Sequence, residues 1–177
     1  MAETLFLLQM AGVPGSGKSA LARLIGRSTG AVVLDKDVLK TAALEAGLEE
    51  SQAGGVAYEG FFALADHLLG QGLSVVLDSP SFWETIPTKG AAIATERHVP
   101  YYFIECICPD RKELARRLRD RPRLASNPGV ETIDADWTTI APPGPYLNID
   151  TTQPIERCLA LALDYLGAND VDETAGS

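Results

Sequence analysis

Long apolar runs are missing from this sequence, and their absence excludes one class of protein. Stretches such as residues 5–8 and 75–77 are far shorter than the roughly 18 residues that a membrane-spanning helix needs. The amino-terminal run follows no basic segment and leads into a glycine cluster instead of a cleavage site, which argues against a secretory signal. We therefore expect a cytoplasmic protein that makes no contact with a membrane.

Cysteine is also scarce, which excludes a disulfide framework and a cysteine-rich metal site. The three cysteines, Cys106, Cys108 and Cys158, form no pair or cluster with the spacing of a zinc or redox motif. An odd number of cysteines at such spacing is typical of reduced thiols. We expect all three to pack in the core.

Positive charge is in deficit, with 15 Lys and Arg against 24 Asp and Glu and a net charge of −9. This balance argues against a protein that holds nucleic acid by neutralising many phosphates. One segment departs from it, because residues 110–123 carry seven basic and three acidic residues. The sequence thus predicts one local basic site in an acidic protein.

The 177 residues, 46% of them hydrophobic, suit one compact domain. Short β-rich runs alternate with helical patterns, which favours βα units around a parallel sheet. We expect a single domain over residues 1–167 and an acidic, flexible tail over 168–177. The expected strands are residues 4–10, 31–34, 73–80, 101–107 and 146–152. The expected helices are residues 18–28, 37–46, 55–69, 85–98 (broken near its start by Pro87), 110–121 and 154–166.

The clearest functional motif is the glycine-rich stretch GVPGSGKS at residues 12–19. It satisfies the pattern G-x-x-x-x-G-K-[ST] between a strand and a helix, as a phosphate-binding loop does. Its glycines let backbone N–H groups turn toward an anion, and the helix N-terminus adds partial positive charge. We expect Lys18 to reach the β- and γ-phosphates and the Ser19 hydroxyl to bind Mg²⁺. The expected nucleotide-binding residues are Gly12, Pro14, Gly15, Ser16, Gly17, Lys18 and Ser19.

Three aspartates follow predicted strands on the same side of the sheet. Asp35 and Asp37 come at the end of the second strand and Asp78 at the end of the third, where ligands of open parallel sheets bind. Each alone could also be a helix cap or a solvated loop residue. We expect Asp37 to orient the acceptor and accept the proton of its hydroxyl, and Asp35 and Asp78 to serve Mg²⁺ with Ser19.

The basic segment predicts a helix with guanidinium groups near the transferred phosphate. Planar guanidinium donors suit the spread negative charge of phosphoryl transfer. Arg117 and Arg121 are one helical turn apart, so both can approach one target, within a long lid of about residues 111–145. A solvated basic face is the alternative interpretation of the same pattern.

An ordered set of motifs resembles the small P-loop kinases of the zeta-toxin, polynucleotide kinase and chloramphenicol phosphotransferase type, in the adenylate-kinase-like branch. Besides GVPGSGKS, the set comprises DKDVLK, GLSVVLDSP, the arginines at 117 and 121, and IDTTQPIE, and it extends over nearly the whole chain. The resemblance implies a three-layer α/β P-loop fold with a five-stranded parallel sheet of order 2-3-1-4-5 and a closing lid. It also implies that Asp37 acts on the acceptor hydroxyl.

These observations together predict an ATP- and Mg²⁺-dependent kinase for a hydroxyl of a small molecule. ATP is preferred because the guanine-reading N-K-x-D motif is absent and because of the resemblance. In polynucleotide kinases a basic residue three places after the aspartate contacts substrate phosphate, and Lys40 occupies that position. A 5′-hydroxyl polynucleotide kinase therefore remains an alternative. An ATPase without an acceptor is another. Phe82 and Trp83 are expected to line a pocket for a flat or apolar acceptor, although an aromatic pair there is as often packing.

Overall fold

Five parallel strands form the centre of the protein, for which a computed structural model describes residues 4–120, 124–126 and 138–168. The strands pair in the order β2-β3-β1-β4-β5, which confirms the predicted sheet. Their bounds are β1 Leu7–Ala11, β2 Val32–Asp35, β3 Val75–Asp78, β4 Tyr101–Ile107 and β5 Leu147–Asp150.

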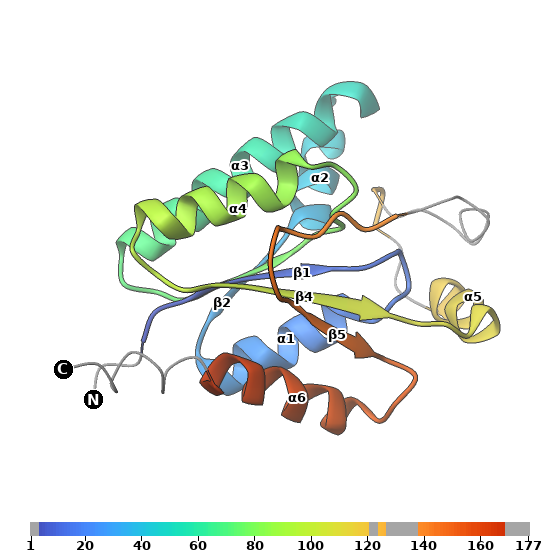
Figure 1. The fold of residues 1–177 in the computed structure, drawn as a ribbon. Coiled ribbons are helices and arrows are strands. Elements are labelled where there is room, and N and C mark those ends of the chain that lie inside the picture. Colours follow the sequence, from blue (N-terminus) through green and yellow to red (C-terminus); the bar gives the residue numbers. More distant parts are fainter. Residues whose placement is uncertain (1–3, 121–123, 127–137, 169–177) are drawn as a thin grey trace.

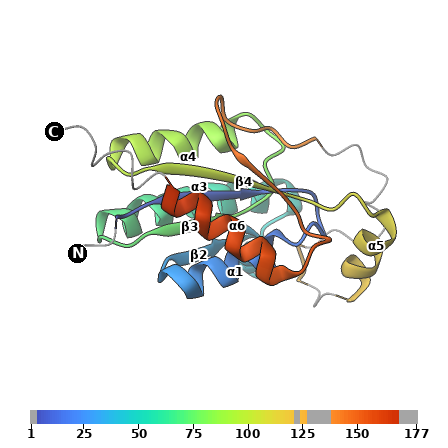
Figure 2. The ribbon, with the colours of Figure 1, turned by 60° about the horizontal axis from the view of Figure 1, so that its bottom comes forward.

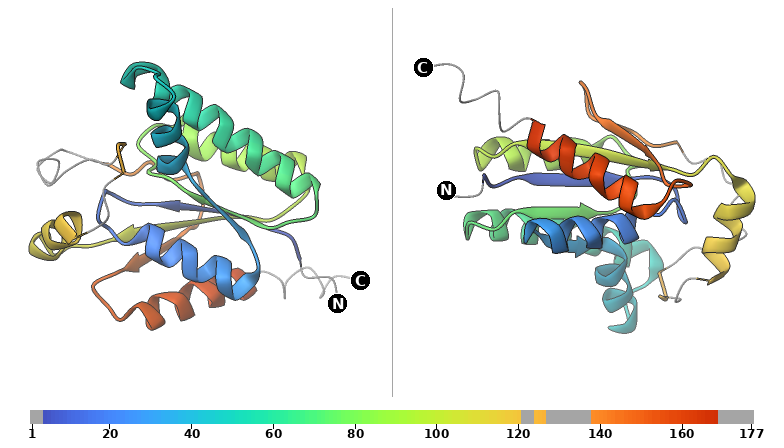
Figure 3. Two further views of the ribbon diagram at one scale, coloured as in Figure 1. Left: turned by 180° about the vertical axis from the view of Figure 1, so that it is seen from behind. Right: turned by 90° about the horizontal axis from the view of Figure 1, so that it is seen from below.

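Six helices lie around this sheet in the described residues. They are α1 Lys18–Thr29, α2 Lys36–Glu45, α3 Glu50–Gly70, α4 Thr85–Glu96, α5 Arg111–Asp120 and α6 Ile155–Ala168. Helices α3 and α4 cover one face and α1 and α6 the other, whereas α5 stands beyond the carboxyl end of β4 (Figures 1 and 2). Views from behind and below show α1 and α6 side by side under the sheet (Figure 3). None of the helices in the described ranges is long and apolar enough to cross a bilayer.

Side chains alternate in direction along the strands, and apolar side chains on both faces of the sheet form two cores. Leu7 of β1 points toward α3 and α4, where it packs with Phe61 and Leu77. Its neighbour Leu8 points toward α1 and α6 and joins the cluster of Ile25 and Ile104. Successive side chains of a strand face opposite ways, so apolar residues at consecutive positions predict a sheet covered on both faces.

Two helices differ from the sequence-based prediction at their starts. Helix α3 begins at Glu50, whereas we expected residue 55, because Gly54 and Gly55 are poor helix formers and weaken the pattern. Pro87 does not break α4: it lies in the first turn, where the missing N–H removes no helical hydrogen bond.

The cysteines are free thiols, as expected, but only two of them are core residues. Cys106 and Cys158 are buried and Cys108 is half-buried. Burial raises the pKa of Cys106 to about 12, so this thiol stays protonated at neutral pH. The expected flexible tail lies mostly outside the described residues, with Ala168 closing α6.

Candidate active site

The loop between β1 and α1 has the backbone shape of an anion-binding site. Gly12, Gly15 and Gly17 have φ values of 136°, 82° and 91°, a region that residues with a Cβ rarely adopt. Position 12 also lies tight against β4, because a Cβ there would be 2.4 Å from the Cys106 carbonyl oxygen. Gly17 leads directly into α1. The N-terminus of this helix therefore opens onto the loop, as phosphate binding requires.

Lys18, Ser19 and Asp78 meet at the first turn of α1 and the end of β3. Lys18 is 8% exposed and Asp78 is 3% exposed. Burial raises the pKa of Asp78, whereas the charge of Lys18 and a hydrogen bond from the Ser19 hydroxyl lower it in part. The Oδ1 atom of Asp78 is buried and has no hydrogen-bond partner among the described residues. A buried carboxylate oxygen of this kind is suited to a cation or its bound water.

The site offers a hydroxyl and one buried carboxylate rather than a cage of carboxylates. Within the described part of the chain, no group of three or more His, Cys, Asp or Glu residues could hold a metal ion. Mg²⁺ is commonly held by one or two carboxylates, substrate phosphates and several waters. Ser19 and Asp78 fit this mode of binding.

Asp35 is the N-cap of α2. Its Oδ1 accepts a hydrogen bond of 2.9 Å from the Asp37 backbone N–H, and it is the register partner of Asp78 across β2 and β3. The helix-cap interpretation, which the sequence left open, therefore accounts for the Asp35 side chain. Its expected contribution to a metal site stays a prediction.

The carboxylate of Asp37 lies in the first turn of α2 and is paired with the residue before it. Lys36 Nζ is 2.5 Å from Asp37 Oδ1, and the Lys36 residue is only 8% exposed. The same ammonium lies 5.6 Å from the centre of the Tyr58 ring. Sequence reasoning missed Lys36 because a lysine at a helix start is usually a solvated residue.

Two described segments between α5 and β5 contact this edge of the sheet. Ser126 Oγ donates to the Asp37 carbonyl oxygen at 2.9 Å and lies 3.0 Å from Thr41 Oγ1. Ser81 Oγ donates to the Ile140 carbonyl oxygen at 2.6 Å, and the Ile140 N–H donates back to Ser81 O at 2.6 Å. Two described parts of the segment expected to form the lid, at Ser126 and Ile140, thus contact α2 and the loop after β3.

Arg117 connects α5 to the phosphate-binding loop. It donates to Thr151 Oγ1 at 2.9 Å, to Thr151 O at 2.6 Å and to Glu113 Oε1 at 2.7 Å. The Thr151 hydroxyl in turn donates to the Ser16 carbonyl oxygen at 2.6 Å. Sequence reasoning missed Thr151: its motif contributed to the resemblance but gave no signal of a contact with the loop. The partner proposed for Arg117, Arg121, lies outside the described residues.

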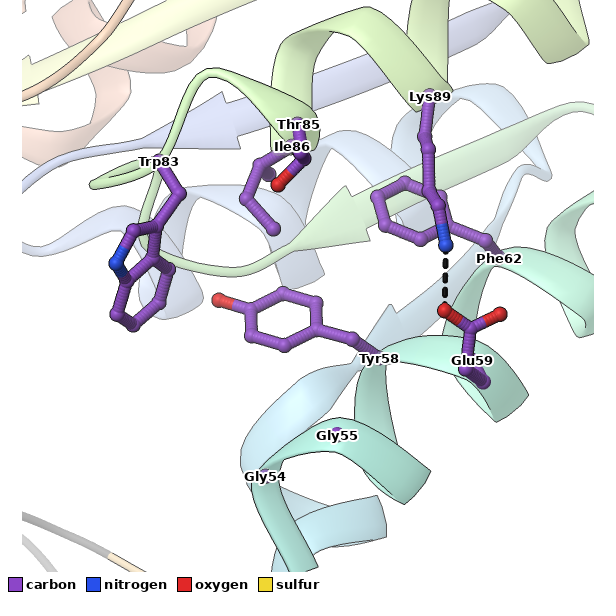
Figure 4. Close-up of a pocket in the computed structure, with 9 residues that line it drawn as sticks. All are labelled: Gly54, Gly55, Tyr58, Glu59, Phe62, Trp83, Thr85, Ile86 and Lys89. Atoms are coloured by element: carbon purple, nitrogen blue, oxygen red, sulfur yellow. Dashed lines mark hydrogen bonds and ion pairs between the residues drawn. The ribbon is translucent and has the colours of Figure 1, made fainter. Parts of the chain in front are cut away.

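The residues expected on the acceptor side have different environments. Lys40 is paired with Glu50, the first residue of α3. Phe82 contacts Trp83 edge-on, with ring centres 6.3 Å apart, whereas Trp83 is 56% exposed and lines a hollow of about 440 Å³ between α3 and α4 (Figure 4). The sequence therefore predicted Trp83 as one residue that lines a hollow, but it did not predict the other lining residues.

Comparisons with known proteins give a family and a set of structures with the same fold. The AAA_33 family, described as an AAA domain, matches residues 7–140. A candidate kinase of Chloroflexus aurantiacus has a TM-score of 0.75 at 19% identity, over 95% of this chain and 99% of that one. An APS kinase of Mycobacterium tuberculosis, in complex with AMPPNP and APS, has a TM-score of 0.66 at 22% identity, over 93% and 98%.

A gluconokinase of Sinorhizobium meliloti has a TM-score of 0.65 at 19% identity, over 98% of each chain. At these identities the likeness establishes a shared P-loop kinase-like fold. No protein of curated function matches the chain in sequence.

Proposed function

The chain belongs to the AAA_33 family, and from this premise we propose that it is an ATP- and Mg²⁺-dependent kinase that moves the γ-phosphate to a hydroxyl of a small molecule. One observation carries the proposal. Among the described residues, Oδ1 of buried Asp78 has no hydrogen-bond partner, and it lies with Lys18 and Ser19 beside a loop shaped for phosphate. A structural carboxylate would have its hydrogen bonds satisfied within the protein.

The triphosphate would be held by the backbone of the loop. The N–H groups of residues 15 and 17–19, at the N-terminus of α1, supply partial positive charge, and the Lys18 ammonium supplies a full charge for the β- and γ-phosphates. Ser19 and Asp78 would hold Mg²⁺, with Asp35 on the neighbouring strand available to its waters. When bound, Mg²⁺ offsets the negative charge that develops on the phosphates during transfer.

Asp37 would accept the proton of the acceptor hydroxyl as the hydroxyl oxygen attacks the γ-phosphorus. Its carboxylate is at the same edge of the sheet as Asp78, since the charge of Asp37 acts on the pKa of Asp78. Pairing with Lys36 offsets the repulsion between neighbouring carboxylates. We assign Lys36 the role of holding Asp37 before the acceptor binds.

Arg117 would add positive charge on the nucleotide side of the loop. Its Nη1 would be 3.3 Å from a Cβ at position 17, so it lies beside the loop backbone. Three of its five N–H donors are used by Thr151 and Glu113, so it also positions the loop. Arg121 is proposed to act with it.

The proposal is tested by replacing Asp37 with asparagine. Asp37→Asn keeps the size of the side chain but removes the base, so we expect transfer to fall by about 10²–10⁴-fold, with the affinity for ATP little changed. Transfer is measured with labelled ATP against a panel of APS, gluconate, sugars, neutral aromatic alcohols and a 5′-hydroxyl oligonucleotide. Binding is measured by calorimetry. Unchanged transfer to the true acceptor would overturn the assignment of the base.

The same panel separates the alternatives. Transfer to the oligonucleotide would indicate a polynucleotide kinase, and release of phosphate to water with every acceptor would indicate an ATPase. The pairing of Lys40 with Glu50 supports the small-molecule assignment, because this lysine already has a counter-ion.

A further inference from the structure

We infer that the hollow between α3 and α4 is the acceptor site and that it selects a neutral, flat, apolar body that carries the reacting hydroxyl. This inference rests on the proposed kinase function and adds the class of substrate. We call the hollow the aromatic slot and define it by Gly54, Tyr58, Phe62, Trp83, Ile86 and Lys89. Its volume of about 440 Å³ is within the range of small-molecule sites.

Aromatic rings form the walls of the aromatic slot. Tyr58 is stacked on Phe62, with ring centres 6.3 Å apart and planes at 20°. Trp83 is perpendicular to Tyr58 at 6.2 Å and 87°. Figure 4 shows the Tyr58 ring between Trp83 at one end and the Lys89–Glu59 pair at the other. An indole that stays 56% exposed beside such rings offers a flat apolar surface to an aromatic partner.

Glycines on α3 leave room for an occupant. Gly54 and Gly55 line the hollow, yet neither has a positive φ and a Cβ on either would meet nothing within 4 Å. Neither backbone strain nor packing within the described protein therefore requires glycine there, although glycine is the poorest helix former after proline. The absence of side chains at these two positions keeps this side of the hollow open to an occupant.

The lysines near the rings exclude a cationic occupant. Lys36 lies 5.6 Å from the centre of the Tyr58 ring and Lys89 lies 5.7 Å from the centre of the Phe62 ring. Cations bind the faces of aromatic rings, and here two such faces already have one. Each ammonium is also paired with a carboxylate, Lys36 with Asp37 and Lys89 with Glu59, so these lysines offer an anion no unpaired charge and a neutral body is favoured.

The aromatic slot adjoins the residue proposed as the base. Lys36 contacts both the Tyr58 ring and the Asp37 carboxylate, so a single side chain spans the distance between them. Burial and then the charge of Asp37 raise the pKa of Tyr58, consistent with this proximity. A flat body against Trp83 and Tyr58 would present its hydroxyl on the side of Asp37.

The test measures binding to the aromatic slot without nucleotide. In a Trp137→Phe background, which leaves Trp83 as the one tryptophan, the emission of Trp83 is titrated with 2-phenylethanol, 2-cyclohexylethanol and choline. We expect 2-phenylethanol to bind about two- to tenfold more tightly than the saturated alcohol, because an aromatic pair contributes about 0.5–1.5 kcal/mol, and we expect choline not to bind. Equal dissociation constants for the first two alcohols would overturn the inference.

A matched pair of variants locates the binding. Gly54→Leu fills the aromatic slot, whereas Gly60→Leu places the same side chain in open space on the same helix. We expect Gly54→Leu to weaken 2-phenylethanol binding by about tenfold or more and Gly60→Leu to leave it unchanged. Thermal unfolding checks that both fold, since leucine favours the helix. Equal effects of the two variants would contradict the assignment.

ATP binding is measured separately by calorimetry, so the two proposals can fail independently. A protein that binds ATP but not 2-phenylethanol would contradict the aromatic slot and leave the kinase proposal intact. A protein that binds 2-phenylethanol but no nucleotide would overturn the proposed kinase, and with it the role of the aromatic slot as an acceptor site.

Discussion

Asp78 combines burial with a negative charge in a way that a folded protein rarely tolerates without a ligand. The residue is 3% exposed, and its Oδ1 has no hydrogen-bond partner in the described residues. Burial of an ionised carboxylate costs free energy unless a cation or hydrogen bonds compensate. Lys18 and Ser19 compensate in part, since they lower a pKa that burial raises. The part of this cost that is not compensated lowers the stability of the ligand-free protein.

We predict that Asp78→Asn stabilises the ligand-free protein and weakens its binding of Mg²⁺ and ATP. Because the pKa of Asp78 is raised in the folded state, its contribution to stability is present at low pH and is lost as the pH rises through that pKa. Asparagine does not titrate, so the melting temperature of the variant should exceed that of the parent increasingly as the pH rises above about 4, the ordinary pKa of an aspartate, toward the raised pKa of Asp78. Thermal unfolding without nucleotide measures this difference.

Asp66→Asn is the control, because its effect on the melting temperature should change with pH in the opposite direction. Its hydrogen bonds to Arg97 lower the pKa of Asp66, so its small contribution is present at neutral pH and is lost as the pH falls. A melting temperature of Asp78→Asn below that of the parent at every pH would contradict our account of Asp78.

Thr151, after the end of β5, joins three elements that are distant in the sequence. Its hydroxyl accepts from Arg117 of α5 and donates to the carbonyl of Ser16 in the loop before α1. Because Thr151 and Ser16 are both buried, the Ser16 carbonyl oxygen would lose this donor in a buried position if the hydroxyl were removed. The shape of the phosphate-binding loop therefore depends on α5 and β5 as well as on its own glycines.

Thr151→Val should destabilise the protein by about 1–3 kcal/mol, since buried donors and acceptors lose their partner, and should weaken ATP binding. Thr152→Val is the control: Thr152 is exposed and bonds Asp150, so we expect a change within about 0.5 kcal/mol. Urea unfolding and calorimetry with ATP measure the two effects. Similar losses in both variants would argue against a special role for Thr151.

Elements with a strong local pattern could be predicted, and those with a weak pattern could not. The strand before the loop and helix α1 follow from residues 7–29 alone, because the motif and its flanks are contiguous. The start of α3 could not be predicted, since Gly54 and Gly55 oppose a helix that packing against α2 and the sheet stabilises. Tertiary contacts outweigh propensity in this way when the apolar face is buried.

The domain brings its proposed functional residues to the carboxyl edge of one parallel sheet. Ser19 and Asp37 follow β1 and β2, and Asp78 is the last residue of β3, so three neighbouring strands of the sheet deliver them to one place. Ligands of open α/β sheets bind at this edge. The acidic net charge of −9 is offset there by Lys18 and Lys36 in the described protein.

Binding of ATP and Mg²⁺ should stabilise the domain as one unit. A ligand present at 100 times its dissociation constant adds about 2.7 kcal/mol, which for a domain of this size raises the melting temperature by roughly 5–10 °C. Lys18→Ala, or removal of Mg²⁺ with a chelator, should abolish most of the shift. A shift of the same size with Lys18→Ala would contradict the proposed phosphate site.

The sequence alone was sufficient for the P-loop, for the alternation of strands and helices and for the carboxylates at strand ends, because each depends on residues close together in the chain. It could not predict that Thr151 bonds Ser16, 135 positions away, that Lys36 pairs with Asp37 above Tyr58, or that Trp83 faces α3. Those contacts arise when helices pack on both faces of the sheet, and the packing is set by all the side chains at once.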